Sequence, residues 1–122
     1  MARSTSQRLT TLQRRYRELA AQLADVGYIA AGSITRRHTR CANTNCRCHA
    51  DPPQMHGPYW QWTAKVNGKP VTRRLSSTEA DLYQQWIDND RQLRAITTQM
   101  REVAAEATNL ILKQDAEKRA KV

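Results

Sequence analysis

Three cysteines and one histidine in the middle of the chain follow the spacing Cys41-x4-Cys46-x-Cys48-x7-His56. Three thiolates and one imidazole are ligands with which proteins hold structural zinc, in a tetrahedral arrangement that leaves no open position. An odd number of cysteines suits disulfide pairing poorly, whereas clustered thiolates in a polar segment suit a metal. The sequence therefore predicts a structural Zn²⁺ site, although it lacks the two C-x2-C halves of a standard zinc finger.

The fourth ligand has three candidates among the histidines. His56 is favoured, because the rigid turn at residues 51–53 (Asp-Pro-Pro) can return the chain to the cysteines. His49 directly follows a cysteine, and successive side chains of an extended segment point in opposite directions. His38 lies three residues before the first cysteine and can close a small loop. A water molecule or a side chain of another chain is also possible as the fourth ligand.

The surroundings of the cysteines offer little for catalysis. A catalytic zinc keeps a bound water and usually has a carboxylate or histidine base beside it. Asp51 is the only acidic residue between positions 27 and 77. We therefore expect that the protein is not an enzyme.

Positive charge is concentrated in the same part of the chain. The formal net charge is +9, and residues 27–77 carry eight Arg and Lys against one acid. A surface of one sign favours a polyanionic partner, and contacts to phosphates make such binding depend on salt. We therefore expect binding to DNA or RNA, mainly to its phosphate backbone, through eight residues: Arg36, Arg37, Arg40, Arg47, Lys65, Lys69, Arg73 and Arg74.

The basic residues surround a predicted β-hairpin. Asn67-Gly68 between two alternating runs is typical of a two-residue hairpin turn. Pro70 indicates an edge strand, and residues 33–37 can add a third strand. The turn sets the pairs Val66–Lys69, Ala64–Val71, Trp62–Arg73 and Trp60–Leu75, with a cation–π contact expected between Trp62 and Arg73. The face expected to be buried carries Trp60, Trp62, Ala64, Val66, Val71 and Leu75.

A first helix is predicted over residues 4–26. Ser4 and Gln7 have the spacing of a capping box, and Gly27 is the expected C-terminal stop. Apolar residues recur at steps of three and four, which indicates a heptad seam: Leu9, Leu12, Tyr16, Leu19, Leu23 and Val26.

A longer helix is predicted over residues 78–118. Ser76 and Glu79 have the spacing of a capping box, and a second seam runs from residue 82 to residue 110, with Asn89 as its one polar position. If both helices start from the central module, the shorter one ends near Met100. A second copy of the chain or a partner helix is then expected on Val103, Ala107, Leu110 and Ile111.

These elements predict an α+β fold. A small zinc-stapled module, with a hairpin or a three-stranded sheet, is flanked by two helices that pack as an antiparallel coiled coil. The expected parts are an N-terminal helix (1–27), the module (28–77) and the C-terminal helix (78–122), in one structural domain. No apolar run approaches the roughly 18 residues of a membrane span, so we expect a cytoplasmic protein without membrane contact.

Several motifs resemble a family of small bacterial proteins with a domain of unknown function. They are Arg40-Cys41, Cys46-Arg47-Cys48, the stretch from His56 to Trp62 that begins His-Gly-Pro-Tyr, and Asn67-Gly68-Lys69. The resemblance spans about residues 28–100, and it implies a zinc knuckle in which the histidine of His-Gly-Pro-Tyr recurs, which favours His56. Ala42-Asn43 stands where relatives have Gly-Lys. The resemblance implies no activity.

Two functions fit these observations. The first is nucleic-acid binding by a small basic zinc protein through its central β module. The second is a coiled-coil adaptor or assembly subunit, in which zinc is structural and the basic charge serves solubility.

Overall fold

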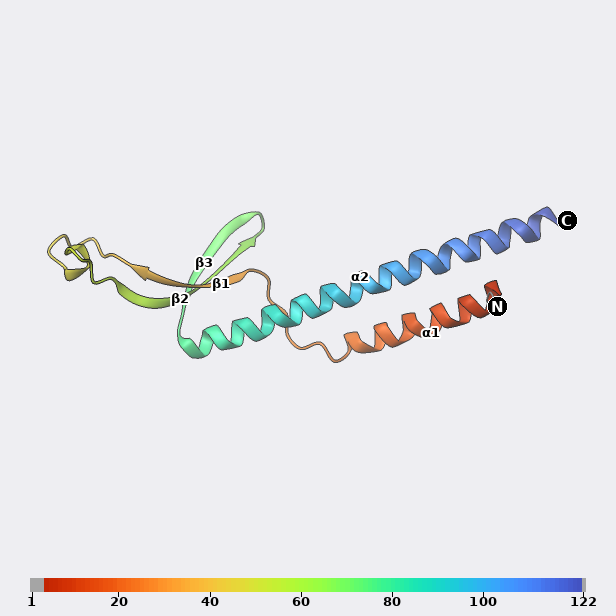
Figure 1. Cartoon of the computed structure of the whole chain (residues 1–122), viewed down its shortest axis with the longest axis horizontal. Coiled ribbons are helices and arrows are strands. Elements are labelled where there is room, and N and C mark those ends of the chain that lie inside the picture. Colours follow the sequence, from red (N-terminus) through yellow and green to blue (C-terminus); the bar gives the residue numbers. More distant parts are fainter. Residues whose placement is uncertain (1–3, 122) are drawn as a thin grey trace. The chain divides into compact units, whose positions relative to one another are not determined.

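The computed structural model describes residues 4–121, and its fold is α+β, as the sequence predicts (Figure 1). One helix precedes a three-stranded antiparallel sheet, and a helix of 44 residues follows it. The elements in chain order are α1 (Thr5–Leu23), β1 (Ser33–Thr39), the short 3-10 helix η1 (Arg47–His49), β2 (His56–Val66), β3 (Lys69–Leu75) and α2 (Ser77–Ala120).

The chain forms two compact units. One unit combines the two ends of the chain, up to Gly27 and from Arg91 onward, and contains α1 and most of α2. The other is Tyr28–Asp90, which contains the sheet and the first turns of α2. We call them the helical unit and the β unit.

The start of α1 has the predicted capping box. The Ser4 hydroxyl accepts a hydrogen bond from the Gln7 backbone N–H at 3.2 Å, and the Gln7 side chain accepts one from the Ser4 N–H at 3.0 Å. The end of α1 differs from the prediction, because the helix stops at Leu23 and not at Gly27. Residues 24–26 each donate to the carbonyl three positions earlier, so the last turn tightens and closes the helix without a glycine.

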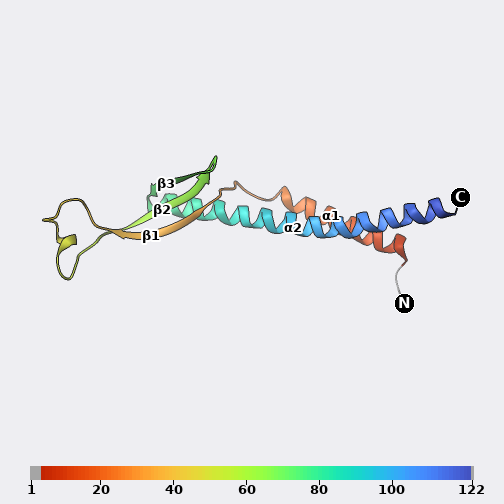
Figure 2. The ribbon, with the colours of Figure 1, turned by 90° about the horizontal axis from the view of Figure 1, so that it is seen from above.

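The helical unit consists of α1 packed antiparallel on α2, as predicted (Figure 2). Arg8 donates to Glu106 at 2.8 Å and Arg15 donates to Gln99 at 2.9 Å, so positions rise along one helix as they fall along the other. The core between them is a narrow apolar seam, with buried side chains at Leu12, Leu19 and Ile96.

The pairing of the two helices is displaced from the predicted one. The partner of α2 does not end near Met100, because α1 contacts Gln99 and Glu106. Val103 and Ala107 are therefore half-buried and line a groove with α1, and they do not face water as expected. Leu110 is also half-buried, whereas Ile111 is 52% exposed.

The cause of this displacement lies in residues 24–32, which form no regular element. Within the β unit, Ala30 donates to the Trp86 carbonyl at 3.1 Å, and the Asn89 side chain donates to the Tyr28 carbonyl at 2.7 Å. An extended segment therefore contacts the first turns of α2 where a second helix was expected. Asn89 is satisfied by this segment and not by a facing helix.

The sheet has the order β1-β2-β3, and the register of the hairpin formed by β2 and β3 is the predicted one. Val66 pairs with Lys69 across a two-residue turn whose Asn67 and Gly68 both have positive φ, at 52° and 79°. Such angles match the right-handed twist of the flanking strands, which explains the preference for Asn-Gly at this place. Pro70 lies on an edge strand, as expected.

One face of the sheet packs on the first turns of α2. Trp62 contacts Tyr83 with ring centroids 5.0 Å apart, and Tyr83 meets Trp86 edge-on at 5.1 Å. Ala64, Leu75, Ala80 and Ile87 are buried in this unit. The prediction that Val66 and Val71 are buried is wrong, since they lie beside the turn and are 45% and 38% exposed.

Candidate metal centre

The ends of two paired strands position the first and last residues of the cysteine and histidine cluster. Thr39 at the end of β1 pairs with His56 at the start of β2. Cys41 follows two residues after Thr39, so the register of the sheet brings the two ends of the intervening loop together. Cys46 and Cys48 lie inside this loop at the short helix η1.

The four side chains lie close enough together to hold one metal ion. Their ligand atoms all lie within 4.8 Å of one another. The Sγ atoms of Cys41 and Cys48 are 3.6 Å apart, and Cys46 Sγ is 3.3 Å from His56 Nε2. With bonds of about 2.3 Å to sulfur, two thiolates of a tetrahedral site lie roughly 3.8 Å apart. The cluster can therefore hold a metal ion without rearranging the strands.

Backbone hydrogen bonds give the loop its tight turns. The Asn43 side chain accepts from the Asn45 N–H at 3.0 Å, and the Asn43 carbonyl accepts from the Cys46 N–H at 3.0 Å. Asparagine favours such turns because its side chain replaces a backbone acceptor. The Arg47 carbonyl accepts from the N–H groups of Ala50 and Gln54, both at 3.1 Å. These bonds bring Cys46 and Cys48 to the ends of the strands.

The local hydrogen bonds favour a thiolate at one cysteine in particular. The Cys48 backbone N–H, followed by the Cys48 side chain, lowers the pKa of Cys46 to about 6. For Cys41, a hydrogen bond with the Asn43 backbone lowers the pKa, but the neighbouring Cys48 and Cys46 thiols and burial outweigh it, so the pKa is raised. Cys48 is fully buried, and its Sγ accepts from the Cys41 N–H at 3.4 Å.

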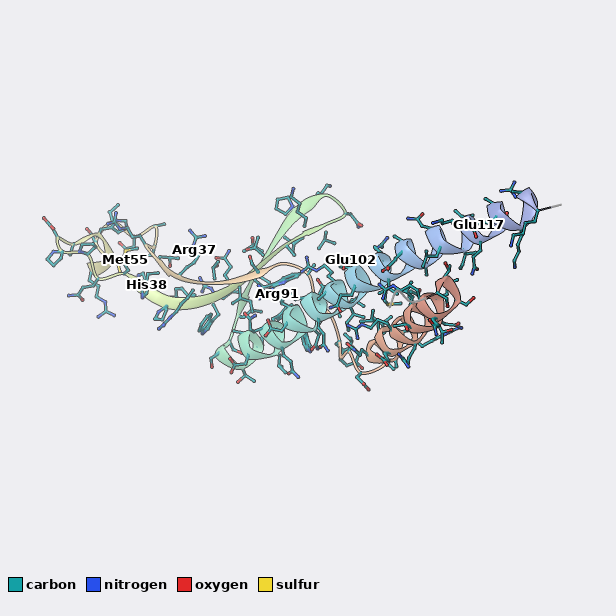
Figure 3. All side chains as sticks on the ribbon, turned by 45° about the vertical axis from the view of Figure 1, so that its right-hand side comes forward. Arg37, His38, Met55, Arg91, Glu102 and Glu117 are labelled. Atoms are coloured by element: carbon teal, nitrogen blue, oxygen red, sulfur yellow. The ribbon has the colours of Figure 1, made fainter. Side chains whose placement is uncertain are left out.

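The three histidines have different positions. His56 places Nε2 in the cluster. His49 is exposed, and its Nε2 donates to the Cys41 carbonyl at 2.7 Å, so it braces the backbone of a ligand. His38 is an exposed residue of β1 at the irregularity between Arg37 and Thr39 (Figure 3). The structure therefore places His56, the favoured candidate, with the cysteines.

The eight basic residues do not share one surface. Cross-strand partners point to the same face of a sheet. The register therefore puts Arg36 and Arg73 on the face with Trp62, which packs on α2. Arg36 lies over the Trp60 ring at 5.8 Å, and Arg73 donates to the Tyr83 hydroxyl at 3.3 Å, in place of the expected contact with Trp62. Lys69 shares this face at the hairpin turn.

The opposite side of the sheet, which we call the open face, carries three other basic residues, Arg37, Lys65 and Arg74. It has a hollow of about 200 Å³, and Arg74 stacks on the Tyr59 ring with its Cζ 3.9 Å from the centroid. The uncharged polar residues of the open face are Ser33, Thr35, Tyr59, Gln61, Thr63 and Thr72.

The last two of the eight are Arg40 and Arg47. Both are exposed residues of the loop between β1 and β2 (40–55), which we call the metal loop because it carries three of the candidate ligands. Figure 3 shows Arg37 on β1 and Met55 in this loop.

Two functional features were not predicted from the sequence. The Arg74–Tyr59 stack had a signal, because the predicted register already placed Arg74 opposite Gln61, two residues from Tyr59 on the same face. The contact of His49 with the Cys41 carbonyl had none, since it depends on how the loop turns.

The fold and the cluster define a small α+β protein with a Cys3His site that can hold a metal ion. The chain belongs to the family described as Domain of unknown function (DUF6788), whose model matches residues 9–85. The match starts earlier and ends earlier than the resemblance implied, and it includes most of α1, all four clustered residues and the hairpin. No curated protein and no solved structure matches the chain. Among the described residues, no helix has the length and apolar character needed to cross a membrane.

Proposed function

We propose that the cluster binds one structural zinc ion. Three thiolates and an imidazole suit zinc better than the hard cations Ca²⁺ and Mg²⁺, which take oxygen ligands. Between residues 40 and 55, Cys48 is the only buried residue. The loop therefore has almost no apolar packing of its own, and bonds to a metal would replace it.

The test of the zinc proposal is elemental analysis of full-length protein purified without chelator. We expect one zinc per chain and less than one tenth of that in the Cys46→Ser/Cys48→Ser variant. Substitution with Co²⁺ should give the intense visible bands of a tetrahedral thiolate site. Wild-type protein without stoichiometric metal would contradict the proposal.

We further propose that the protein binds nucleic acid through phosphate contacts of the β unit. The observation that supports this most is the open face, where Arg37, Lys65 and Arg74 surround uncharged polar groups. Among residues 4–121, none of these three forms an ion pair with a carboxylate. Cations that form no ion pair with a carboxylate are available to neutralise phosphates.

The structure narrows the set of residues expected to make these contacts. Arg36 and Arg73 already contact Trp60 and Tyr83 on the helix-facing side, so they contribute less. Arg40 and Arg47 in the metal loop can extend the contact beyond the open face.

The test is fluorescence anisotropy with labelled oligonucleotides at several salt concentrations. Each phosphate contact contributes about 0.9 to the slope of log K against log salt for a duplex and about 0.7 for a single strand. The Arg37→Ala/Arg74→Ala variant should lose up to about two such contacts. Arg14→Ala/Lys121→Ala removes the same charge from exposed positions outside the β unit and serves as the control. Equal slopes in both variants would contradict the proposal.

In this proposal the protein has no catalytic activity. The four clustered side chains are enough to fill a tetrahedral metal, so no position is left for a reacting water. Asp51, the only acid near the site, is exposed.

A second candidate function is assembly through the outer part of α2. An apolar groove of about 470 Å³ lies between α1 and α2 and includes Leu9, Tyr16, Val103 and Ile111. Ile111 and Leu112 are 52% and 66% exposed. Residues 102–121 carry four acids and four bases, so this segment can meet a second copy of itself without repulsion.

The assembly candidate is tested by light scattering at several protein concentrations. We expect a dimer that the Ile111→Gln/Leu112→Gln variant converts to a monomer, while Asn109→Gln keeps the dimer mass. A monomer at all concentrations would rule this candidate out.

A further inference from the structure

The open face combines stacking, hydrogen-bonding and charged groups in one hollow. The hollow of about 200 Å³ is lined by Arg37, Tyr59, Gln61, Thr72 and Arg74, among others. The arrangement of these residues follows from the register of the sheet, because Arg37 pairs with Tyr59 and Gln61 pairs with Arg74 on adjacent strands. A cation, an aromatic ring, an amide and a hydroxyl therefore line the same hollow.

We infer that the open face is a binding site for single-stranded nucleic acid, with one base stacked on the Arg74–Tyr59 pair and the neighbouring phosphate at Arg37. This inference rests on the proposed nucleic-acid function and specifies the form of the ligand.

The Arg74 guanidinium lies over the ring of Tyr59 and forms the proposed stacking platform with it. The Arg74 Cζ lies 3.9 Å from the centroid of the Tyr59 ring, which is the separation of two groups in van der Waals contact. Tyr59 is half-buried, and Arg74 is exposed. The guanidinium therefore covers one side of the ring, and because Arg74 is exposed a ligand can reach it. Planar guanidinium and aromatic groups are the surfaces on which unpaired bases stack.

The groups around the platform suit the edge of a base. Gln61 has an amide that both donates and accepts, and the Thr72 hydroxyl can do either. Both line the hollow. None of the open-face residues is acidic, so nothing there repels a phosphate.

The same features are of little use for a duplex. In a duplex the bases are stacked on one another, and only their edges and the phosphates are accessible. Reading the major groove takes a helix or a protruding ribbon, whereas the open face is a sheet surface with a shallow hollow. A duplex can still touch Arg37, Lys65 and Arg74, but it gains nothing from stacking.

The test compares a labelled 12-nucleotide single strand, as poly-dT and poly-U, with a duplex of equal length on the zinc-loaded full chain. We expect single strands to bind at least 10-fold more tightly, because stacking of one base contributes about that factor. The decisive variant is Arg74→Lys, which keeps the positive charge and removes the planar guanidinium group. It should weaken single-strand binding several-fold and leave duplex binding and its salt slope unchanged.

Two controls make the outcome specific. Arg74→Ala removes charge and plane, so it should weaken binding to both ligands. Arg14→Lys makes the same exchange as Arg74→Lys at an exposed position of α1, outside the open face, and should change neither affinity. Zinc content and circular dichroism of each variant report whether the fold is kept.

The possible results separate the inference from the function on which it rests. Equal affinity for single strand and duplex, with Arg74→Lys without effect, would overturn the single-strand site and leave phosphate binding intact. Absence of binding to either ligand at low salt would overturn both. A single-strand preference that Arg74→Lys abolishes would establish the platform.

Discussion

In the proposed zinc-bound protein, the metal loop and the helical unit are each stabilised by a different kind of interaction. Residues 40–55 bury one side chain, that of Cys48, and their three cysteines together with His56 supply four possible ligand atoms within 4.8 Å of one another. The helical unit buries Leu12, Leu19 and Ile96 along a seam between α1 and α2. A loop without a core depends on a few strong bonds, whereas the seam depends on many weak contacts.

Because of this difference, we expect the two regions to lose their structure independently of each other. Removing a ligand should abolish the order of the loop and spare the helices, because the seam contains no ligand. Removing a seam side chain should lower the stability of the helices and leave metal binding unchanged.

The largest expected effect follows loss of a ligand. Cys48→Ser or His56→Ala should lower zinc affinity by more than 100-fold, because a structural zinc site contributes about 10–16 kcal/mol of apparent binding free energy. Competition with a chromophoric chelator measures this. His49→Ala is the matched control, since the His49 side chain donates to the Cys41 carbonyl and is not one of the four clustered ligands. It should keep stoichiometric zinc and lose about 10- to 100-fold in affinity at most. An equal loss in His49→Ala and His56→Ala would contradict the assignment of ligands.

The next largest effect is expected in the helical seam. Leu19 is 1% exposed, so Leu19→Ala should lower the free energy of unfolding by about 2–5 kcal/mol. Chemical denaturation followed by circular dichroism measures it. The same substitution at Leu112, which is 66% exposed, should change the free energy of unfolding of the monomer by less than about 0.5 kcal/mol. Zinc content should stay at one per chain in both variants, and a loss of zinc in Leu19→Ala would show that the two regions are coupled.

A smaller effect is expected inside the β unit at Gly32. Its φ is +100°, and a Cβ there would collide with the Thr63 carbonyl and lie 2.8 Å from Ala64 Cβ. Gly32→Ala should therefore destabilise the sheet by about 1–3 kcal/mol, from backbone strain and overlap together. Gly68 also has positive φ, but no atom lies within 4 Å of the added Cβ, so Gly68→Ala reports the strain alone. If the two variants were equally stable, the close approach at Gly32 would be absent in solution.

The smallest effect concerns the capping box of α2. Ser76 accepts from the Glu79 N–H at 3.1 Å, and Ser76→Ala should cost about 1 kcal/mol. Hydrogen bonds with the Ser76 backbone and hydroxyl lower the pKa of Glu79. A depressed pKa in the folded state gives stability that is present above the unfolded value and is lost as the pH falls through the folded value. Stability curves from pH 7 to pH 3 should therefore converge for wild type and Glu79→Ala, and curves that stay parallel would contradict this linkage.

Several features could be predicted from the sequence because they are local. Both capping boxes form from residues three positions apart, as at Ser4 and Gln7. The hairpin register follows from the Asn67-Gly68 turn, because a two-residue loop fixes every later pair. The clustering of the three cysteines follows from their close spacing in the sequence, which confines their side chains to one loop.

Other features depend on how distant segments meet, and the sequence did not determine them. The seam of α2 predicted a helical partner but not its position, because an extended segment with Tyr28 and Ala30 contacts the first turns of α2. The exposure of Val66 and Val71 depends on which part of the hairpin α2 covers.

The sequence by itself determined the elements, the hairpin register and the clustering of the three cysteines, since each depends on neighbours in the chain and on the fixed periodicities of helix and strand. Only the tertiary structure decided which basic residues share the open face with Tyr59, and which of them contact Trp60 and Tyr83 instead. The reason is that hydrogen bonding is satisfied locally, whereas the packing of a face depends on whichever distant segment covers it.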